Sequence, residues 1–175
     1  MQPDPVLIIG SGSQSACNIT GLCAAIAERM QRPVNVVLTE SARRFVTEDT
    51  LRNVGGAQHV LTEDSVQLTA TPNHIWLSAR CCCVVVYPAS AGFIGKMANG
   101  LALDLASTIL LAAHAKPIFV FPSTNPEMWA NPLVKRNIAA LESCHFNVYR
   151  TGDGLAPDVE SAAQYVASQL QGRES

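Results

Sequence analysis

The sequence predicts an α/β fold: a doubly wound parallel sheet of the Rossmann-like or flavodoxin-like kind, built in three layers. Two observations predict it. First, five short apolar runs alternate with helix-like segments along the 175 residues. Second, the central run, residues 84–87, consists of four β-favouring residues without a charge, which is typical of a strand buried on both faces. Right-handed β–α–β connections then place helices on both sides of the sheet.

Two strand–helix units are expected at the start of the chain. Residues 6–9 are expected to form the first strand, and a helix follows from about residue 16 to 31. Residues 34–38 are expected to form the second strand, directly after a proline that breaks the helix. Ser41 is expected to cap a helix that starts at the next residue.

The middle of the chain is expected to be less regular until the central strand. Residues 47–73 contain a short helix at about 50–54 and otherwise form a long connection. The central strand is expected to stop at Pro88, where a helix follows after a turn of small residues. A long apolar helix over residues 101–115 comes next, with Asp104 as a carboxylate on its surface.

Two more strands and two more helices complete the predicted fold. Residues 117–121 are expected to form the fourth strand, and a helix that runs to residue 143 begins after Asn131 as cap, with proline in its first turn. Residues 146–149 are expected to form the fifth strand, and 159–171 the closing amphipathic helix.

Small or hydroxylated turns follow four of the expected strands. Open α/β sheets bind ligands at the carboxyl ends of their strands, and bare backbone N–H groups at the start of a helix suit a phosphate. We therefore expect one nucleotide-like ligand to contact all four turns. They are residues 10–15, 39–41, 88–92 and 122–129.

A nicotinamide cofactor is an alternative occupant of these turns. Gly10 and Gly12 begin a G-x-G-x-x-G fingerprint, but Ser15 stands at the place of the third glycine. Glu40, just after the second strand, stands where a ribose-binding acid is expected. The partial match keeps a nicotinamide-dependent enzyme open.

The composition favours a single domain, residues 1–175, whose surface is partly covered by sister subunits. Charged residues are only 15% of the chain and hydrophobic ones 48%, which is apolar for a monomer. The net charge of −2, without a basic run, argues against nucleic acid as a partner. No uncharged run is long enough to cross a membrane, and the polar first residues predict no signal peptide. We therefore expect a cytoplasmic protein.

The six cysteines are expected to be small buried hydrophobes rather than metal ligands. They stand at positions 17, 23, 81, 82, 83 and 144, and none belongs to a CxxC pair. Because neighbouring side chains alternate across a strand, three adjacent cysteines do not converge on one metal. The sequence therefore predicts no metal site, and thiols that stay reduced in the cytoplasm.

Two motifs and one histidine carry a resemblance to a known family. Pro88-Ala89-Ser90-Ala91 is followed by Lys96-Met97-Ala98-Asn99-Gly100, and the second motif is Pro122-Ser123-Thr124-Asn125-Pro126-Glu127-Met128-Trp129. The histidine stands in His74-Ile75-Trp76-Leu77. Over residues 6–149 the chain resembles the homo-oligomeric flavin-containing cysteine decarboxylases, which share PASANxxxKxxxG and PxMNxxMW motifs and an upstream histidine.

The resemblance implies an FMN-binding decarboxylase that assembles as a homotrimer or a multiple of trimers, with FMN between subunits. It implies that His74 is a base near the substrate thiol or Cβ, and that Asn125 holds the substrate carboxylate. FMN would oxidise the thiol to a thioaldehyde, from which CO2 can leave. The implied substrate-binding residues are Gly92, Met128 and Trp129. The implied FMN-binding residues are Gly10, Ser11, Gly12, Ser13, Thr39, Ser41, Phe45, Pro88, Ala89, Ser90 and Ala91.

Two departures from the motifs concern the substrate. Gly92 replaces the asparagine of PASAN, and Thr124 replaces the methionine before Asn125. The first removes a possible side-chain contact near the flavin or the substrate, and both bear on substrate geometry.

Among the branches of this family, the resemblance favours the peptidyl-cysteine decarboxylases, which process the C-terminal cysteine of ribosomally made precursor peptides. Phosphopantothenoylcysteine decarboxylases carry a later cysteine in an ACGD/E-like motif, whereas the last cysteine here, Cys144, lies outside such a motif. Flavin prenyltransferases lack the PxMNxxMW signature. Residues 151–158 stand in the place of the substrate-gripping segment and are short. These two branches, and a flavin-binding subunit without catalysis, remain alternatives.

Overall fold

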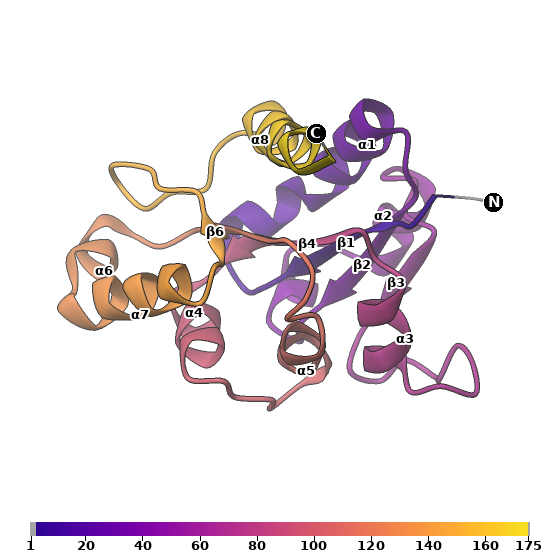
Figure 1. Ribbon diagram of the computed structural model, residues 1–175, viewed down its shortest axis with the longest axis horizontal. Coiled ribbons are helices and arrows are strands. Elements are labelled where there is room, and N and C mark those ends of the chain that lie inside the picture. Colours follow the sequence, from indigo (N-terminus) through magenta and orange to yellow (C-terminus); the bar gives the residue numbers. More distant parts are fainter. Residues whose placement is uncertain (1–2, 175) are drawn as a thin grey trace.

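The computed structural model, which describes residues 3–174, is built on one six-stranded parallel sheet (Figure 1). The strand order is β3-β2-β1-β4-β5-β6, so the order reverses between β1 and β4. The strands are β1 (Val6–Gly10), β2 (Val34–Leu38), β3 (His59–Leu61), β4 (Cys83–Ala89), β5 (Ile118–Pro122) and β6 (Asn147–Val148). The predicted doubly wound parallel sheet is confirmed, and the reversal marks where ligands bind in this class of sheet.

Helices cover both faces of the sheet and make three layers. One face carries α1 (Ile19–Met30), α2 (Glu48–Asn53) and α8 (Val159–Glu174). The other carries α3 (Asn73–Ala79), α4 (Ala91–Ala98), α5 (Leu105–Ala112) and α7 (Pro132–Ser143). The short helix α6 (Pro126–Ala130) and the 3-10 helices η1 (Gln14–Asn18) and η2 (Ala42–Arg44) follow strand ends.

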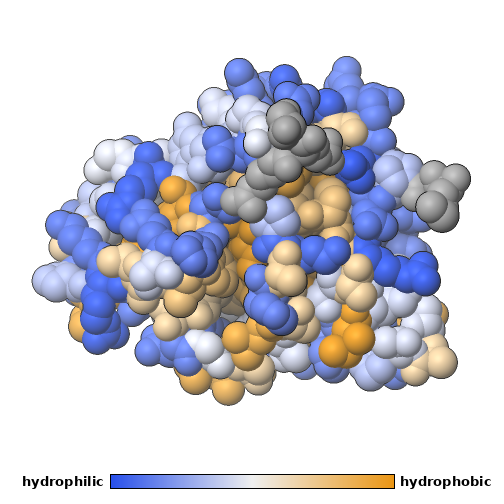
Figure 2. All heavy atoms as spheres, viewed as in Figure 1, coloured by the Kyte–Doolittle hydropathy of each residue, from blue (hydrophilic) through white to orange (hydrophobic). Residues whose placement is uncertain are grey.

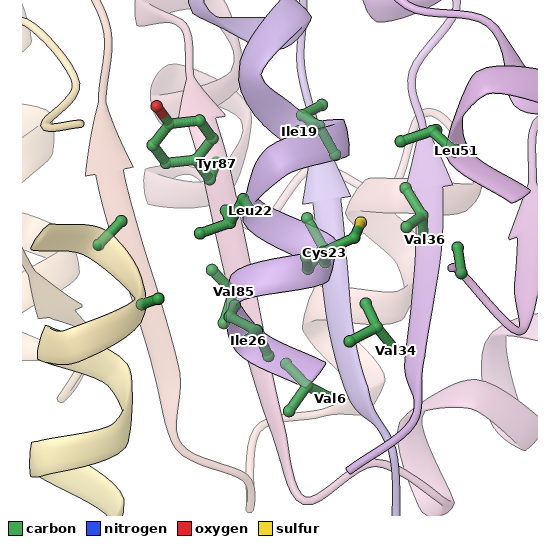
Figure 3. Packing of buried hydrophobic residues seen from close by; sticks show 14 of the residues in the cluster. Val6, Ile19, Leu22, Cys23, Ile26, Val34, Val36, Leu51, Val85 and Tyr87 are labelled. Atoms are coloured by element: carbon green, nitrogen blue, oxygen red, sulfur yellow. The ribbon is translucent and has the colours of Figure 1, made fainter. Parts of the chain in front are cut away.

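The core lies on both sides of the sheet because its central strands are buried along their whole length. Helix α1 packs on one side through apolar residues at the spacing of a single helical face. These residues are Ile19, Leu22, Cys23 and Ile26, which lie over Val6, Val34, Val36 and Val85 of the strands (Figure 3). The uncharged apolar runs of the sequence are explained by this two-sided burial.

Two elements between residues 47 and 82 were not predicted. Strand β3 is only three residues long and pairs with β2, and α3 starts within what was expected to be a connection. A three-residue strand is too short for its alternation to be recognised. The predicted sheet of five strands therefore lacked an edge strand.

The central strand was expected to stop at Pro88, but it does not. Strand β4 continues through Pro88 to Ala89, which pairs with Pro122 of β5. The register shifts between Val86 and Ala89, so the ladder is irregular at the residue that has no N–H to donate. The turn that carries the candidate site consequently begins at Ser90.

Three helix starts differ from the prediction. The segment before α1 is the 3-10 helix η1, and Ser41 makes no capping hydrogen bond to the single turn that follows it. The helix expected from residue 101 begins only at Leu105, because Asp104 is its N-cap. The Asp104 carboxylate accepts the Ser107 N–H at 2.8 Å and pairs with the Lys96 ammonium at 2.7 Å. It therefore links the start of α5 to α4.

The cysteines also depart from the prediction. Cys17 and Cys144 are exposed, and the Cys82 and Cys83 Sγ atoms lie 4.0 Å apart on the same side of the sheet. Cys82 precedes the first residue of β4, so the alternation of a strand does not separate it from Cys83. All six cysteines are free, and within residues 3–174 no three His, Cys, Asp or Glu side chains are grouped as metal ligands.

Replacing Asp104 with Ala should lower the free energy of unfolding by about 1–2 kcal/mol, the usual cost of a lost N-cap. Burial opposes the charge of Asp104, but hydrogen bonds from Lys96 and Ser107 outweigh it and lower its pKa. A carboxylate with a lowered folded pKa contributes stability above its unfolded pKa of about 3.9, and this contribution is lost as the pH falls through the folded value. Urea unfolding of both proteins should therefore show a smaller difference near pH 3 than at pH 7. An equal difference at both pH values would exclude a role for the charge.

The surface carries apolar side chains beside the polar ones. Figure 2 shows apolar patches along the lower edge of the visible face, in the region of α4 and α5. Leu101, Leu103 and Leu111 of this region are exposed, and Leu103 has 69% of its surface accessible. Within the described part of the chain, no helix has the length and apolar character that a membrane crossing needs.

Candidate functional site

A pocket of about 700 Å³ lies at the carboxyl edge of the sheet, where β1, β4 and β5 end. It occupies the place where the strand order reverses, as expected for a ligand site in this class of sheet. Three of the four predicted turns meet there. The lining residues are Gly12, Ser13, Gln14, Ser15, Cys17, Asn18, Ser90, Ala91, Gly92, Ser123, Thr124, Asn125, Met128 and Leu155.

The fourth turn lies behind the pocket rather than in its wall. A Cβ added to Gly12 would collide with the Cβ of Ser41, so these two backbones approach closely. The Thr39 N–H donates to the Gly10 carbonyl at 3.0 Å. Gly10, Thr39 and Ser41 therefore support the first turn from behind.

Ser11 ties the first turn to the third. Its hydroxyl donates to the Pro88 carbonyl at 2.8 Å and accepts the Ser90 N–H at 2.8 Å. Ser11 as a whole is only 1% exposed. The hydroxyl of Ser11 is therefore used within the protein, where it fixes how β1 and β4 present their turns to the pocket.

Three serine hydroxyls form a cluster on the pocket wall. The Ser123 Oγ lies 2.7 Å from the Ser13 Oγ and 3.1 Å from the Ser15 Oγ. Three hydroxyls supply three protons, and the two contacts use two of them. One proton is left to donate to a ligand oxygen, which suits a phosphate.

Helix α4 begins at the pocket. The Ser90 hydroxyl caps it by accepting the Phe93 N–H at 3.3 Å. The first N–H groups of a helix have no partner within the helix, so those of Ala91 and Gly92 are available at its positive end. Apart from the adjoining residues and the backbone of its own helix, no atom of the described residues lies within 4 Å of a Cβ added to Gly92, so the departure from PASAN leaves open space.

Asn125 is exposed in the pocket with its amide orientation set by the backbone. It is the N-cap of α6, and its Oδ1 accepts the Met128 N–H at 2.7 Å. Only the oxygen of an amide side chain can accept an N–H, so the Nδ2 group of Asn125 is not used by the cap. Asn125 therefore offers two N–H donors, which suits a carboxylate.

Residues 151–157 fold onto the second motif. The Gly154 carbonyl accepts the Thr124 N–H at 2.9 Å. Gly154 has a φ of +77°, and an added Cβ would lie 2.5 Å from the Trp129 ring. Trp129 thus packs behind this loop instead of lining the pocket, and Leu155 lines it together with Met128.

His74 does not lie in the pocket. It is half-buried near the start of α3, whereas Asn125 starts α6, and these two helices lie at opposite ends of the molecule in Figure 1. Phe45, which is 45% exposed, is also outside the lining. Within one chain, the structure does not bring together the two residues that the resemblance implies are catalytic.

Several residues that line the pocket had no predicted role. Ser15 and Ser123 lie within predicted turns, and their hydroxyls at strand ends could have identified them as ligand-binding residues. Leu155 belongs to a loop that was predicted without a role for this side chain. Cys17 and Asn18 gave no signal, because they were assigned to a regular helix and not to η1.

The pocket fits the flavin nucleotide that the resemblance implies. Its volume falls within the range of about 300–1,000 Å³ that is common for small-molecule and cofactor sites. The serine cluster and the start of α4 offer donors for a phosphate, and small residues leave room for a flat ring. In addition, the buried Oγ1 of Thr124 has no hydrogen-bond partner among residues 3–174.

Comparisons with known proteins agree with this fit. The model of the flavoprotein family matches residues 1–171. The coenzyme A biosynthesis bifunctional protein CoaBC of Bacillus subtilis is 38% identical over 123 residues, which are 68% of this chain and 30% of that protein. The chain therefore spans only about a third of the length of that relative.

Two further proteins match over most of their own length. Epidermin decarboxylase of Staphylococcus epidermidis is 29% identical over 144 residues, 82% of this chain and 76% of that protein. The crystal structure of the FMN-dependent cysteine decarboxylase TvaF from thioviridamide biosynthesis superposes with a TM-score of 0.82 at 30% identity. That match covers 96% of this chain and 98% of the other.

Proposed function

Because this chain belongs to the flavoprotein family, we propose that it is an FMN-dependent decarboxylase acting on the C-terminal cysteine of a ribosomally synthesised precursor peptide. Residues 1–175 act as one catalytic domain. The observation that carries the proposal is the orientation of Asn125, whose free amide N–H groups face a pocket that also holds donors for a phosphate. The relatives named as decarboxylases support the reaction class, and TvaF, which is named as a cysteine decarboxylase, supports the cysteine substrate.

The cofactor is held by the turns at the carboxyl edge. Gly12, Ser13, Ser90 and Ala91 face it directly, and the serine cluster donates to its phosphate. Bound FMN supplies a two-electron oxidation of the substrate thiol, without which CO2 loss would leave a carbanion with no electron sink. Behind these residues, the remaining implied FMN-binding positions maintain the shape of the turns. They are Gly10, Ser11, Thr39, Ser41, Pro88 and Ala89, whereas Phe45 is exposed outside the lining.

The residues around the cofactor bind and orient the peptide. Asn125 holds the substrate carboxylate through its Nδ2 hydrogens, and Gly92 leaves room for the substrate beside it. Met128 and Leu155 exclude water from the reacting atoms. Trp129 fixes the loop that carries Leu155. Each residue thereby has a task that its position allows.

His74 acts from a neighbouring subunit in a homotrimer or a multiple of trimers. It takes a proton from the substrate thiol or Cβ. Exposed leucines near α5 and the separation of His74 from the pocket support an assembly in which one subunit completes the site of another. The free cysteines are compatible with the cytoplasm, which is the proposed compartment.

A second candidate function is the decarboxylation of phosphopantothenoylcysteine without net oxidation. Two observations favour it: the 38% identity to CoaBC, and an exposed thiol, Cys17, in the wall of the pocket. A thiol there would donate a proton to the enethiol, and reduced FMN would return to it the two electrons taken from the substrate thiol, so no external acceptor is needed. The absence of a later cysteine motif, noted in the sequence, is therefore not decisive.

Purified protein should be yellow, release FMN on denaturation, and convert a cysteine-ended peptide to a product that has lost CO2 and two hydrogen atoms. The two hydrogens require an external electron acceptor such as O2. Mass spectrometry with and without O2 measures this, and the same peptide ending in serine is the control. A colourless protein that cannot be reconstituted with FMN would contradict the proposal. Loss of CO2 alone from phosphopantothenoylcysteine, changed by Cys17→Ser to loss of CO2 and two hydrogen atoms, would instead establish the second candidate.

A further inference from the structure

Thr124 carries a hydroxyl that the folded chain leaves without a partner. The residue is 7% exposed, and its Oγ1 makes no hydrogen bond within the described part of the protein. Buried hydroxyls nearly always have a partner, so an orphan at a ligand pocket points to a bond made with the ligand. Thr124 lines the pocket and directly precedes Asn125.

We propose that Thr124 is a second carboxylate-binding residue, whose hydroxyl donates a hydrogen bond to the substrate carboxylate beside the amide of Asn125. This inference rests on the proposed function, because that function supplies the carboxylate. It assigns a role to the one residue of the second motif at which the chain departs from the family pattern toward a polar side chain.

The pocket needs more than one donor for a carboxylate. None of the described residues that line it is a lysine or an arginine, so within one chain only neutral N–H and O–H groups are available to the carboxylate. The hydroxyls of Ser13, Ser15 and Ser123 contact one another in the serine cluster, and the one proton that these contacts leave over is assigned to the phosphate of FMN. The Asn125 amide and the Thr124 hydroxyl are adjacent along the chain, and a carboxylate has two oxygens to accept from them.

Neutral donors also suit the reaction. A carboxylate that leaves as CO2 loses its charge, so a cation bound to it would stabilise the ground state more than the transition state. Neutral donors orient the carboxylate and raise the barrier to CO2 loss less than a cation would. A pair of them fixes its plane, which one donor alone does not.

The proposed contact requires a rotation of the Thr124 side chain. Oγ1 is buried within the protein, so χ1 has to turn to another staggered position that brings the hydroxyl to the pocket. The backbone need not move. It is held on one side by the bond from the Thr124 N–H to Gly154 and on the other by the Asn125 cap of α6.

The test compares two peptides on the FMN-loaded protein: one ending in serine with a free carboxylate, and the same peptide with a C-terminal amide. Calorimetric titration of Thr124→Val should show about tenfold weaker binding of the free acid, the usual effect of one hydrogen bond to a charged group, and unchanged binding of the amide. Thr124→Ser keeps the hydroxyl and should bind as wild type.

Two results would overturn the inference alone: wild type prefers the free acid and Thr124→Val keeps that preference, or Thr124→Val weakens both peptides equally. Wild-type protein that binds neither peptide would overturn the proposed function together with it. FMN content, measured by absorbance, should be the same in all three proteins.

A second readout is the melting temperature without peptide. Thr124→Val removes an unpaired buried hydroxyl and keeps the shape of the side chain, so we expect it to raise the melting temperature by about 2 °C or more. The same substitution thus stabilises the free protein and weakens the carboxylate complex. A lower melting temperature would mean that the hydroxyl already has a partner in the free protein, which contradicts the inference.

Discussion

Replacing Asn125 with Asp should abolish turnover of a cysteine-ended peptide, by about 100-fold or more, and leave FMN bound. The two side chains have nearly the same shape, and an Asp oxygen can still accept the Met128 N–H that caps α6. The Nδ2 donors, however, become a negatively charged oxygen where the substrate carboxylate binds. Two like charges in contact cost several kcal/mol, which accounts for the size of the loss. Single-turnover rates followed by mass spectrometry measure it.

Asn131→Asp is a matched control for that substitution. Asn131 caps α7 in the same way, with its Oδ1 accepting the Leu133 N–H at 2.9 Å, and it is not among the residues that line the pocket. This variant should turn over at the wild-type rate. A near-normal turnover rate for Asn125→Asp, or an equal loss of rate in both variants, would show that Asn125 does not bind the substrate carboxylate.

Replacing His74 with Asn should also abolish turnover, by about 10²- to 10⁴-fold, the range for loss of a catalytic base. The structure adds an expectation about mixtures, because His74 and Asn125 do not share a pocket within one chain. If each site takes His74 from one subunit and Asn125 from the next, His74→Asn and Asn125→Asp subunits can complete each other. In a random equal mixture, about a quarter of the sites receive both native residues.

Co-expression of the two inactive variants should therefore restore about a quarter of the wild-type activity. Native mass spectrometry confirms that mixed assemblies form, and each variant co-expressed with itself is the control. Mixed assemblies without activity would mean that His74 and Asn125 act within one subunit, or that one of the two residues is not catalytic. The recovery cannot come from partial activity of either variant, since each control measures that activity directly.

The sequence by itself determined the layered fold and most of the carboxyl edge. Each of the five predicted apolar runs contributes to a strand of the sheet, because a strand buried on both faces must be apolar along its length. Three predicted turns, at residues 10–15, 88–92 and 122–129, meet at one pocket, because the carboxyl ends of parallel strands share an edge. Both conclusions depend only on the order and polarity of residues along the chain.

Only the tertiary structure decided the details that depend on neighbours across the chain. Strand β3 exists because β2 offers an edge to three residues whose own pattern is too short to read. Cys17 is exposed and Asp104 is a cap because of where η1 and α5 begin. The unpaired hydroxyl of Thr124, and the distance of His74 from the pocket, follow from the packing of distant segments. Hydrogen bonds and pockets are set by separations in space, which a pattern along the sequence does not contain.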